Sequence, residues 1–285
     1  MNAEDRNPER WFLGELIGTF LLVFFGCGGV ATAVALNAPV GLFQVAIIWG
    51  FGLTAAIFVT ARSSGAHLNP AITLAFVVVR GFPRSRIAGY FTAQVLGAFL
   101  AAAMVYVLFG GAIAKFEQAN GIARGQDGSE ASAMVFGEFF PNPGGQPLPA
   151  DAAETVPLWR AAVAEFFGTA LLAVTIFGFT ARTNSTGPGL LTPLIIGCTL
   201  TTLICVFAPL TMAGFNPARD LAPRVFSSLA GWGSLPFTVN GPGWLIVYVL
   251  APVAGAIPGA VLADALHRPA QVEDAIAVPS TLSRS

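Results

Sequence analysis

The sequence predicts an all-α membrane protein with six transmembrane helices, two shorter re-entrant helices and an inverted internal repeat. Three observations lead to this prediction. Hydrophobic residues make up 55% of the 285 residues and charged residues only 10%, which lies well outside the composition of soluble domains. Six apolar runs are long enough to cross a hydrocarbon core of about 30 Å. The tripeptide Asn-Pro-Ala occurs at 69–71 and again at 216–218, roughly half the chain apart.

Six apolar runs are the expected spans. They extend from Trp11 to Leu36, Gly41 to Ala61, Arg86 to Phe109, Leu158 to Ala181, Gly189 to Pro209 and Trp244 to Leu266. The first run is too long for the apolar region of a signal peptide, so it counts as a span. Two further apolar segments, 69–79 and 216–232, are too short or too interrupted to cross, and each opens on Asn-Pro-Ala. We expect them to enter the membrane and stop inside it.

The distribution of arginine predicts the orientation. Basic residues follow the second and fourth spans, at Arg62, Arg80, Arg84, Arg86 and Arg182. The connection near Asn37 carries none. By the positive-inside rule both termini are cytoplasmic, the first re-entrant segment enters from the cytoplasm, and the second enters from outside. Residues 1–10 and 269–285 are then cytoplasmic ends, the second of them mobile. Residues 11–268 form one membrane domain, with a first repeat at 11–109, an external loop at 110–157 and a second repeat at 158–268.

The two halves of the chain resemble each other. Residues 14–25 align with 164–175 without a gap and pair Glu15 with Glu165. From Glu15 to Asn69 is 54 residues, and from Glu165 to Asn216 is 51. The repeated unit therefore contains three spans and one re-entrant segment, and an odd number of spans makes the two copies inverted. Interrupted helices in matching places of inverted repeats indicate a transport site at the middle of the bilayer.

Asn-Pro-Ala is a strong signal for the start of a helix. Asn is a preferred N-cap and Pro a preferred first helical residue. If two such helices meet at the middle of the membrane, their positive dipole ends repel cations, while the Asn side chains still donate hydrogen bonds to a passing oxygen. The irregular backbone before each Asn must then expose its carbonyls to a wet lumen. We expect Gly65, Ala66, His67, Gly214 and Phe215 to line that lumen.

Several classes of function are excluded or disfavoured. A net charge of -1 without a basic run argues against nucleic acid as a partner. The three cysteines, Cys27, Cys198 and Cys205, lie in apolar runs and are interpreted as small buried hydrophobic residues, with neither a disulfide nor a metal site. Only two histidines are present, and no cluster of catalytic groups or phosphate loop is found, so we expect no enzyme and no cofactor. A coupled secondary transporter remains as an alternative.

These motifs resemble those of the aquaporin family, and in particular its glycerol-conducting branch. The resemblance covers about Glu15 to Arg268 and rests on SGAHLNPAIT, on NPARDLAPRVF, in which Asp220 follows the arginine, and on KFEQANGIARG, FPNP and LAGWGSLPFT. It implies an aquaporin-like fold and a homotetramer in the cell membrane, with one pore per subunit. It also implies passive conduction of glycerol, other small uncharged solutes and some water.

The resemblance also implies a set of residues at the narrowest point. Trp49, twenty residues before Asn69, and Arg219 match two of the four positions of that constriction. The other two positions fall on Ile204 and Ala213, where glycerol facilitators usually have Gly and Phe. This departure leaves the ranking of glycerol against water, urea and undissociated metalloid acids open.

The remaining polar residues at membrane depth are expected to be architectural. The family uses the positions of Glu15 and Glu165 to hold the re-entrant backbone, although a carboxylate inside a membrane suggests a proton relay by default. Asp220 complements the helix dipole. Gating by protonation of His67 or by the long external loop stays open. Gly255 and Gly259, with Ala251 and Ala256, have the spacing of close helix packing within or between subunits.

Overall fold

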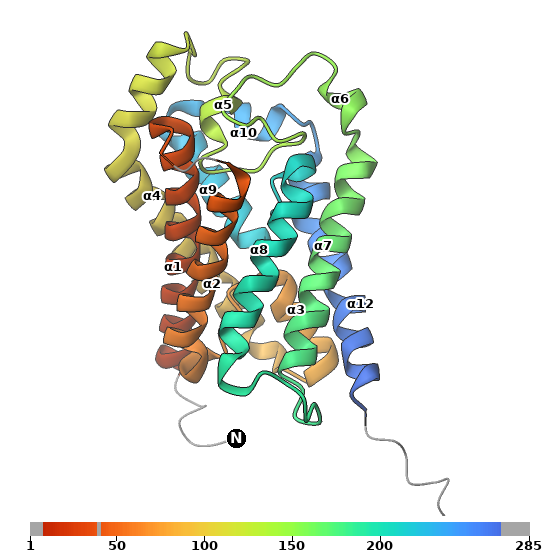
Figure 1. Ribbon diagram of the computed structural model, residues 1–285. Coiled ribbons are helices and arrows are strands. Elements are labelled where there is room, and N and C mark those ends of the chain that lie inside the picture. Colours follow the sequence, from red (N-terminus) through yellow and green to blue (C-terminus); the bar gives the residue numbers. More distant parts are fainter. Residues whose placement is uncertain (1–7, 39–40, 269–285) are drawn as a thin grey trace, which may run out of the picture.

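Six long helices form a bundle in the computed structural model, which describes residues 8–38 and 41–268. Each has the length and composition of a membrane span. Five are α1 (Pro8–Leu36), α2 (Leu42–Ser64), α4 (Ile87–Ala119), α7 (Leu158–Phe179) and α8 (Thr192–Thr211), and the sixth runs through α11 (Gly243–Leu245), η5 (Ile246–Leu250) and α12 (Ala251–Leu266). The predicted six-span helical fold is confirmed. The two ends of the described chain lie at the same end of the bundle (Figure 1).

Two short helices lie inside the bundle at the places where Asn-Pro-Ala occurs. They are α3 (Pro70–Arg80) and α9 (Pro217–Ser227), the second continued by η4 (Ser228–Trp232). Figure 1 places α3 in the lower half of the bundle and α9 in the upper half. Short single turns connect the other elements: η2 (Arg84–Arg86), α5 (Glu130–Ala133), α6 (Ala152–Thr155), η3 (Gly189–Leu191) and α10 (Leu235–Thr238).

The boundaries differ from the expectation at two places. The fourth helix continues to Ala119, although the external loop was expected from Gly110. The extension persists because it buries Ile113 and Glu117 against the loop, where Glu117 pairs with Arg124 at 2.7 Å. At the other end of the chain α1 already begins at Pro8, inside the expected terminal segment. The expectations for residues 1–7 and for the tail 269–285 concern parts outside the described residues.

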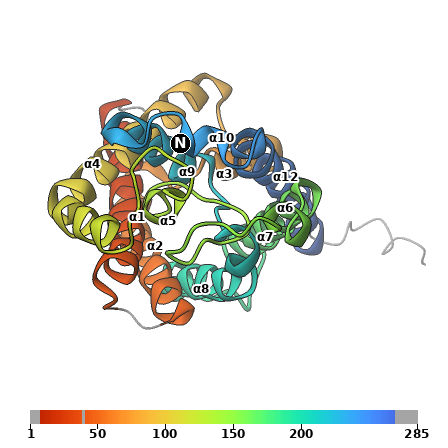
Figure 2. The same cartoon turned by 90° about the horizontal axis from the view of Figure 1, so that it is seen from above.

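The external segment between α4 and α7 is folded into the molecule. Residues 129–140 are buried throughout. Figure 2 shows this segment in yellow-green, crossing over the upper end of the ring of helices. It is anchored to the second half of the chain, because Asn142 Nδ2 donates to the carbonyl of Ala208 at 3.1 Å and Trp232 Nε1 donates to Ser132 Oγ at 3.0 Å. The segment is therefore a lid fixed by hydrogen bonds and apolar burial.

The internal repeat appears as pairs of matching contacts. Helices α1 and α4 approach so closely at Gly97 that a Cβ there would lie 2.3 Å from the carbonyl oxygen of Leu16. In the second half, a Cβ on Gly255 of α12 would lie 2.1 Å from the carbonyl oxygen of Phe166 on α7. Leu16 and Phe166 each follow one of the two aligned glutamates. Gly255 thus packs two helices of the same chain together.

The two repeats meet where α2 crosses α8. A Cβ added to Gly50 would lie 2.5 Å from the carbonyl oxygen of Gly197, and a Cβ added to Gly197 would lie 2.3 Å from that of Gly50. Only glycine allows two backbones to approach this closely. The contact is reciprocal: each glycine meets the carbonyl oxygen of the other, as expected at the symmetry axis that relates the two repeats.

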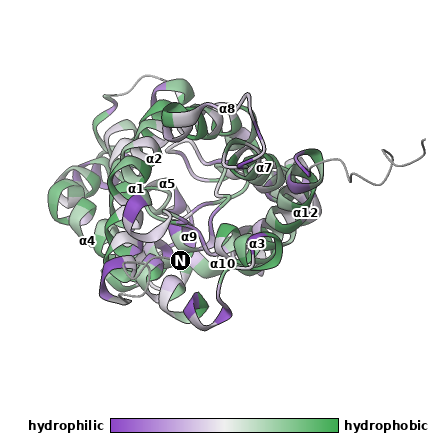
Figure 3. Cartoon of the chain, turned by 90° about the horizontal axis from the view of Figure 1, so that it is seen from below, coloured by the Kyte–Doolittle hydropathy of each residue, from purple (hydrophilic) through white to green (hydrophobic). Residues whose placement is uncertain are grey.

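The long helices consist largely of hydrophobic residues, which Figure 3 colours green, and many of their large apolar side chains are exposed. Exposed examples on five of them are Phe58, Val107, Phe167, Val206 and Leu262. The expectation that all three cysteines are buried is wrong for two of them. Cys27 is buried, whereas Cys198 is exposed and Cys205 is partly exposed, because both lie on the outward side of α8. These outward surfaces suit contact with lipid or with other apolar surfaces.

Candidate functional site

Each short helix starts with an Asn cap followed by Pro. The side-chain oxygen of Asn69 accepts a hydrogen bond from the backbone N–H of Ala71 at 2.9 Å. The side-chain oxygen of Asn216 accepts from the backbone N–H of Ala218 at 3.1 Å and of Arg219 at 3.3 Å. Pro70 and Pro217 are the first helical residues and have no N–H to leave unsatisfied. Both side chains are therefore locked by their own helices.

The two caps also bind across to each other's loop. Asn69 Nδ2 donates to the carbonyl of Phe215 at 2.8 Å, and Asn216 Nδ2 donates to the carbonyl of Leu68 at 2.7 Å. These reciprocal bonds place the N-termini of α3 and α9 next to each other. An amide nitrogen carries two hydrogens, so each Asn retains one donor beyond this bond. The capping can be predicted from the sequence. The two crossed bonds cannot, because each joins residues that lie 146 or 148 positions apart in the chain.

The backbone before each Asn contains several left-handed residues. In the first repeat φ is 51° at Ala66 and 52° at Leu68, and in the second it is 62° at Ala213 and 53° at Phe215. Non-glycine residues adopt this conformation only when the surroundings hold them in it. This backbone borders an internal cavity, which also contacts the other residues expected to line the lumen; the five are Gly65, Ala66, His67, Gly214 and Phe215.

Two buried carboxylates hold these strained loops. Glu15 accepts from the backbone N–H of His67 at 2.9 Å and of Leu68 at 2.7 Å. Glu165 accepts from the corresponding N–H groups of Gly214 at 2.9 Å and Phe215 at 2.7 Å. Neither carboxylate is exposed. Because the loop N–H groups point back at the glutamates, the loop carbonyls are free to face the cavity.

The ring of His67 is fixed in an aromatic cluster. It stacks on Phe76 with 4.3 Å between ring centroids and contacts Phe82 and Tyr90 at 4.8 and 5.0 Å. Its Nδ1 lies 3.2 Å from Thr73 Oγ1. The ring borders the cavity while its polar nitrogen is engaged with the first turn of α3. A change in protonation would have to break this packing before it moved the ring.

Two cavities lie in series along the axis of the bundle. The inner one has a volume of about 330 Å³ and the outer one about 720 Å³. Three residues border both: Trp49, Ile204 and Arg219. Ala213 borders the inner cavity alone, and its neighbour Met212 borders the outer one alone. The four residues expected at the constriction therefore come together at the junction of the two cavities.

The junction is polar on one side and apolar on the other. The guanidinium carbon of Arg219 lies 3.9 Å from the centroid of the Trp49 ring, a cation–π contact. Both side chains are buried. Arg219 also forms an ion pair with Glu138 of the external segment. Trp49 and Ile204 present carbon atoms, so a solute at the junction faces a hydrocarbon wall and a cationic donor.

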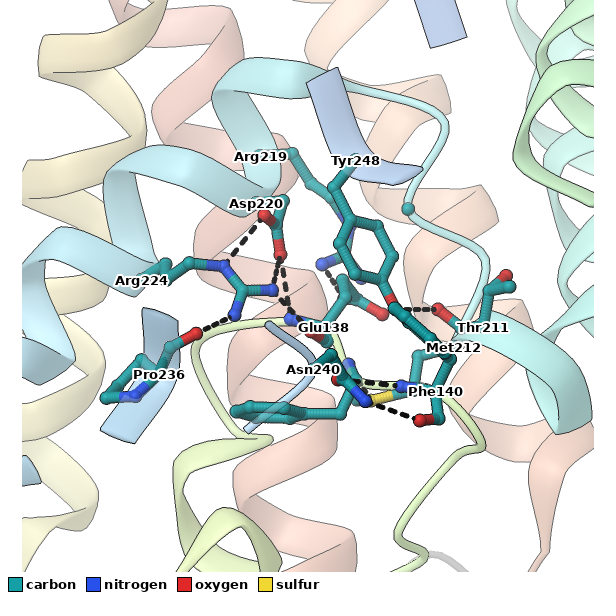
Figure 4. A network of polar contacts seen from close by, with 12 residues as sticks. Glu138, Phe140, Thr211, Met212, Arg219, Asp220, Arg224, Pro236, Asn240 and Tyr248 are labelled. Atoms are coloured by element: carbon teal, nitrogen blue, oxygen red, sulfur yellow. Dashed lines mark hydrogen bonds and ion pairs between the residues drawn. The ribbon is translucent and has the colours of Figure 1, made fainter. Parts of the chain in front are cut away.

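A second ion pair anchors the arginine helix from behind. Asp220 pairs with Arg224 at 2.7 Å, and its Oδ1 also accepts from the backbone N–H of Glu138 at 2.7 Å (Figure 4). Arg224 donates in addition to the carbonyls of Pro236 and Glu138. Asp220 thus helps to tie α9 to the external segment, and it does not border either cavity.

Sequence reasoning missed Glu138. The available signal was one carboxylate in the apolar stretch 134–140, which at membrane depth indicates a specific partner. The partner lies 81 residues away, so no local pattern identifies it. Within residues 8–38 and 41–268, no group of three His, Cys, Asp or Glu side chains has the arrangement of a metal site.

Comparison with known proteins gives one family throughout. The model of the family "Major intrinsic protein" matches residues 3–263. A glycerol uptake facilitator protein of Pseudomonas aeruginosa is 39% identical over 277 residues, covering 96% of this chain and 95% of its own. One from Haemophilus influenzae is 38% identical, covering 90% and 94%. A propanediol uptake facilitator of Citrobacter freundii is 36% identical, covering 88% and 89%.

A solved structure resembles the whole bundle. It is the X-ray structure of the aquaglyceroporin from Plasmodium falciparum, with a TM-score of 0.75 and 25% sequence identity. The match covers 90% of this chain and 96% of that one. The two folds are therefore alike over nearly the whole length of both chains.

Proposed function

Because this chain belongs to the major intrinsic protein family, we propose that it is a passive membrane channel for glycerol and other small uncharged solutes, with some water. The names of its relatives support this substrate class, since two are glycerol uptake facilitators and one is a propanediol uptake facilitator. The chain is a multi-pass membrane protein. Its role is transport and not catalysis.

The observation that carries the proposal is the two-sided junction between the cavities. A polyol has a carbon face and a hydroxyl face. At the junction the carbon face meets Trp49 and Ile204, and a hydroxyl oxygen accepts a hydrogen bond from Arg219. A solute that has left its hydration water behind is then stabilised on both faces. Larger or charged solutes gain no such match.

Exclusion of cations follows from the middle of the same path. The N-termini of α3 and α9 each carry about half a positive charge, and they adjoin each other at Asn69 and Asn216. The free amide hydrogens of these residues donate to a solute oxygen. A cation or a hydrated proton is repelled where an oxygen-bearing neutral solute is accepted.

The finer assignments belong to the same proposal. The selectivity filter consists of Trp49, Ile204, Ala213 and Arg219, the two Asn-Pro-Ala motifs form the cation barrier, and Glu15, Glu165 and Asp220 are structural carboxylates. The channel domain spans residues 11–268. The chain forms a homotetramer in the cell membrane. Both termini lie in the cytoplasm, an orientation that the arginine distribution supports.

The experiment measures several solutes in one preparation. Purified protein in proteoliposomes is given glycerol, water and urea gradients, and the volume change is followed by stopped-flow light scattering. We expect glycerol to equilibrate well above the rate of empty liposomes and independently of any proton or sodium gradient. A channel mainly for water, or for urea or undissociated metalloid acids, would conduct that solute faster than glycerol. Uptake that requires an ion gradient would indicate a coupled transporter and contradict the proposal.

A further inference from the structure

One residue of the external segment, Glu138, is ion-paired with Arg219 of the junction. Its backbone N–H donates to Asp220, its carbonyl accepts from Arg224, and its side chain pairs with Arg219 (Figure 4). The next two residues are also anchored: the N–H of Phe139 points at the sulfur of Met212 at 3.2 Å, and Phe140 exchanges hydrogen bonds with Asn240. Glu138 is therefore held by its backbone independently of its side chain.

The carboxylate of Glu138 is an acidic group at the junction itself. The residue is 2% exposed and borders the outer cavity. One of its oxygens, Oε1, contacts Arg219, while Oε2 has no hydrogen-bond partner. Among the described residues Glu138 is the one carboxylate paired with Arg219, because Asp220 is paired with Arg224. The electrostatic field that a passing solute meets therefore differs between an unpaired arginine and an arginine that is ion-paired with a carboxylate.

The position of the guanidinium depends on few contacts. The Trp49 ring lies 3.9 Å from it on one face. At position 213, on the inner side, an alanine provides no side chain beyond Cβ to press the guanidinium outward. Glu138 supplies the remaining restraint from the outer side. Without it, the long side chain of Arg219 regains rotamers that reach into the lumen.

We propose that Glu138 is a positioning and specificity-determining residue of this pore, which sets the direction and the effective charge of Arg219. Its carboxylate holds the guanidinium against Trp49, and the nitrogens left unpaired donate to the solute. The inference deepens the proposed function, since it rests on Arg219 being part of the filter. It assigns part of the filter to the segment between α4 and α7, outside both repeats.

The first test compares two glutamates of the same segment. Glu138→Gln keeps the size of the side chain and all the backbone anchors but removes the charge. The control is Glu130→Gln, another buried glutamate, whose carboxylate accepts from the backbone N–H groups of Gly128 and Leu148 and borders neither cavity. The ratio of glycerol to water permeability in proteoliposomes should fall about fivefold in Glu138→Gln. Glu130→Gln should keep the parental ratio. Equal ratios in the two variants would overturn the proposal.

The second test asks whether Glu138 acts through Arg219. Arg219→Leu leaves a buried carboxylate unpaired, so its thermal stability in detergent should fall by about 5 °C or more. Adding Glu138→Gln to Arg219→Leu should restore most of that loss, and it should leave the permeability ratio of Arg219→Leu unchanged. If Glu138→Gln shifts the ratio equally with and without Arg219, its effect comes from loop packing, and the proposal is wrong.

The two proposals fail in different ways. If the parent protein does not conduct glycerol, the proposed function is wrong, whereas the rescue of stability still tests the pairing of Glu138 with Arg219. If the parent conducts glycerol but Glu138→Gln does not restore the stability of Arg219→Leu, the proposed channel function is supported and the proposed role of Glu138 is wrong. Should Glu138→Gln alone fail to fold, the double variant with Arg219→Leu provides the same comparison.

Discussion

At the residue scale, Ile204 and Ala213 give the junction its particular cross-section. Ile204 borders both cavities and adds a branched side chain to the apolar wall. Ala213 has a left-handed backbone and offers only a methyl group to the inner cavity. Compared with the Gly and Phe usual in glycerol facilitators, the larger Ile204 and the smaller Ala213 compensate for each other in volume but not in shape. The opening is consequently apolar and branched on the side of α8.

The compensation between these two residues can be tested by exchange. Ala213→Phe should overfill the junction because Ile204 leaves no room for a ring, and overpacking of a filled site costs about 1–3 kcal/mol. Glycerol flux in proteoliposomes should fall about tenfold or more, and water flux should fall less, because water needs a narrower opening. The double variant with Ile204→Gly should recover glycerol flux, since the two residues share one cross-section. A single variant that conducts glycerol like the parent would remove Ala213 and Ile204 from the constriction.

At the element scale, the two short helices work as a pair. Each is capped by its own Asn and bound by the other's Asn, so neither N-terminus is positioned alone. At membrane depth, the side-chain amides of the two Asn residues supply hydrogen bonds to backbone carbonyls that an unbroken helix would have satisfied itself. The positive ends of two dipoles are thereby held together in spite of their mutual repulsion.

Asn216→Asp changes the charge at this meeting point. The carboxylate keeps the cap but adds a negative charge, and it has no N–H for the carbonyl of Leu68. Proton leak through proteoliposomes should rise about tenfold, since the interaction of a charge with a helix end amounts to about 1 kcal/mol or more when partly buried. Asn184→Asp is the matched control, because Asn184 also donates to a backbone carbonyl, that of Gly178, away from both cavities. An unchanged leak in well-folded protein would count against the dipole barrier.

Helix packing can be tested on α4 alone. Gly97→Ala places a methyl carbon 2.3 Å from the backbone oxygen of Leu16, which has no freedom to move aside. The same change at Gly111 meets no atom within 4 Å. We expect Gly97→Ala to lower thermal stability by the equivalent of about 2 kcal/mol or more. Gly111→Ala should be neutral or stabilise slightly, because alanine favours the helix. Equal melting temperatures would show that α1 and α4 can separate without cost.

The elements differ in how far the sequence reveals them. The six spans and the two helix starts follow from long apolar runs and from Asn-Pro, which are local signals. The extension of α4 to Ala119 was missed, because it depends on burial against a loop distant in the chain. Glu138 was missed for the same reason. Signals that lie within one turn or one span are readable in a single sequence, whereas pairings between segments are not.

At the scale of the whole molecule, the pore has a cover built from the non-repeated part of the chain. The segment between α4 and α7 is buried over 129–140 and reaches the junction at Glu138. A segment with this many anchors opens only if several buried contacts break together. Gating by motion of this segment is therefore disfavoured, and its role is to shape the outer cavity.

The orientation of the molecule can be measured with its single lysine. Lys115 is exposed and borders the outer cavity, so the proposed topology places it outside the cell. A membrane-impermeant amine reagent should label the protein in intact cells, and Lys115→Arg should abolish that label. Permeabilised cells of the variant should still react at the N-terminal amine. Labelling of Lys115 only after permeabilisation would place this mouth in the cytoplasm and reverse the orientation.

The reciprocal contact between Gly50 and Gly197 has a consequence for the origin of the fold. It is the place where an element of one half meets its own counterpart, as at the axis of a symmetric dimer. A half-length ancestral chain that inserted in both orientations would have met a second copy of itself at this point. Before duplication, one glycine would have served both sides of the contact. After duplication the two positions could mutate separately, although a side chain at either one would meet the backbone carbonyl of the other.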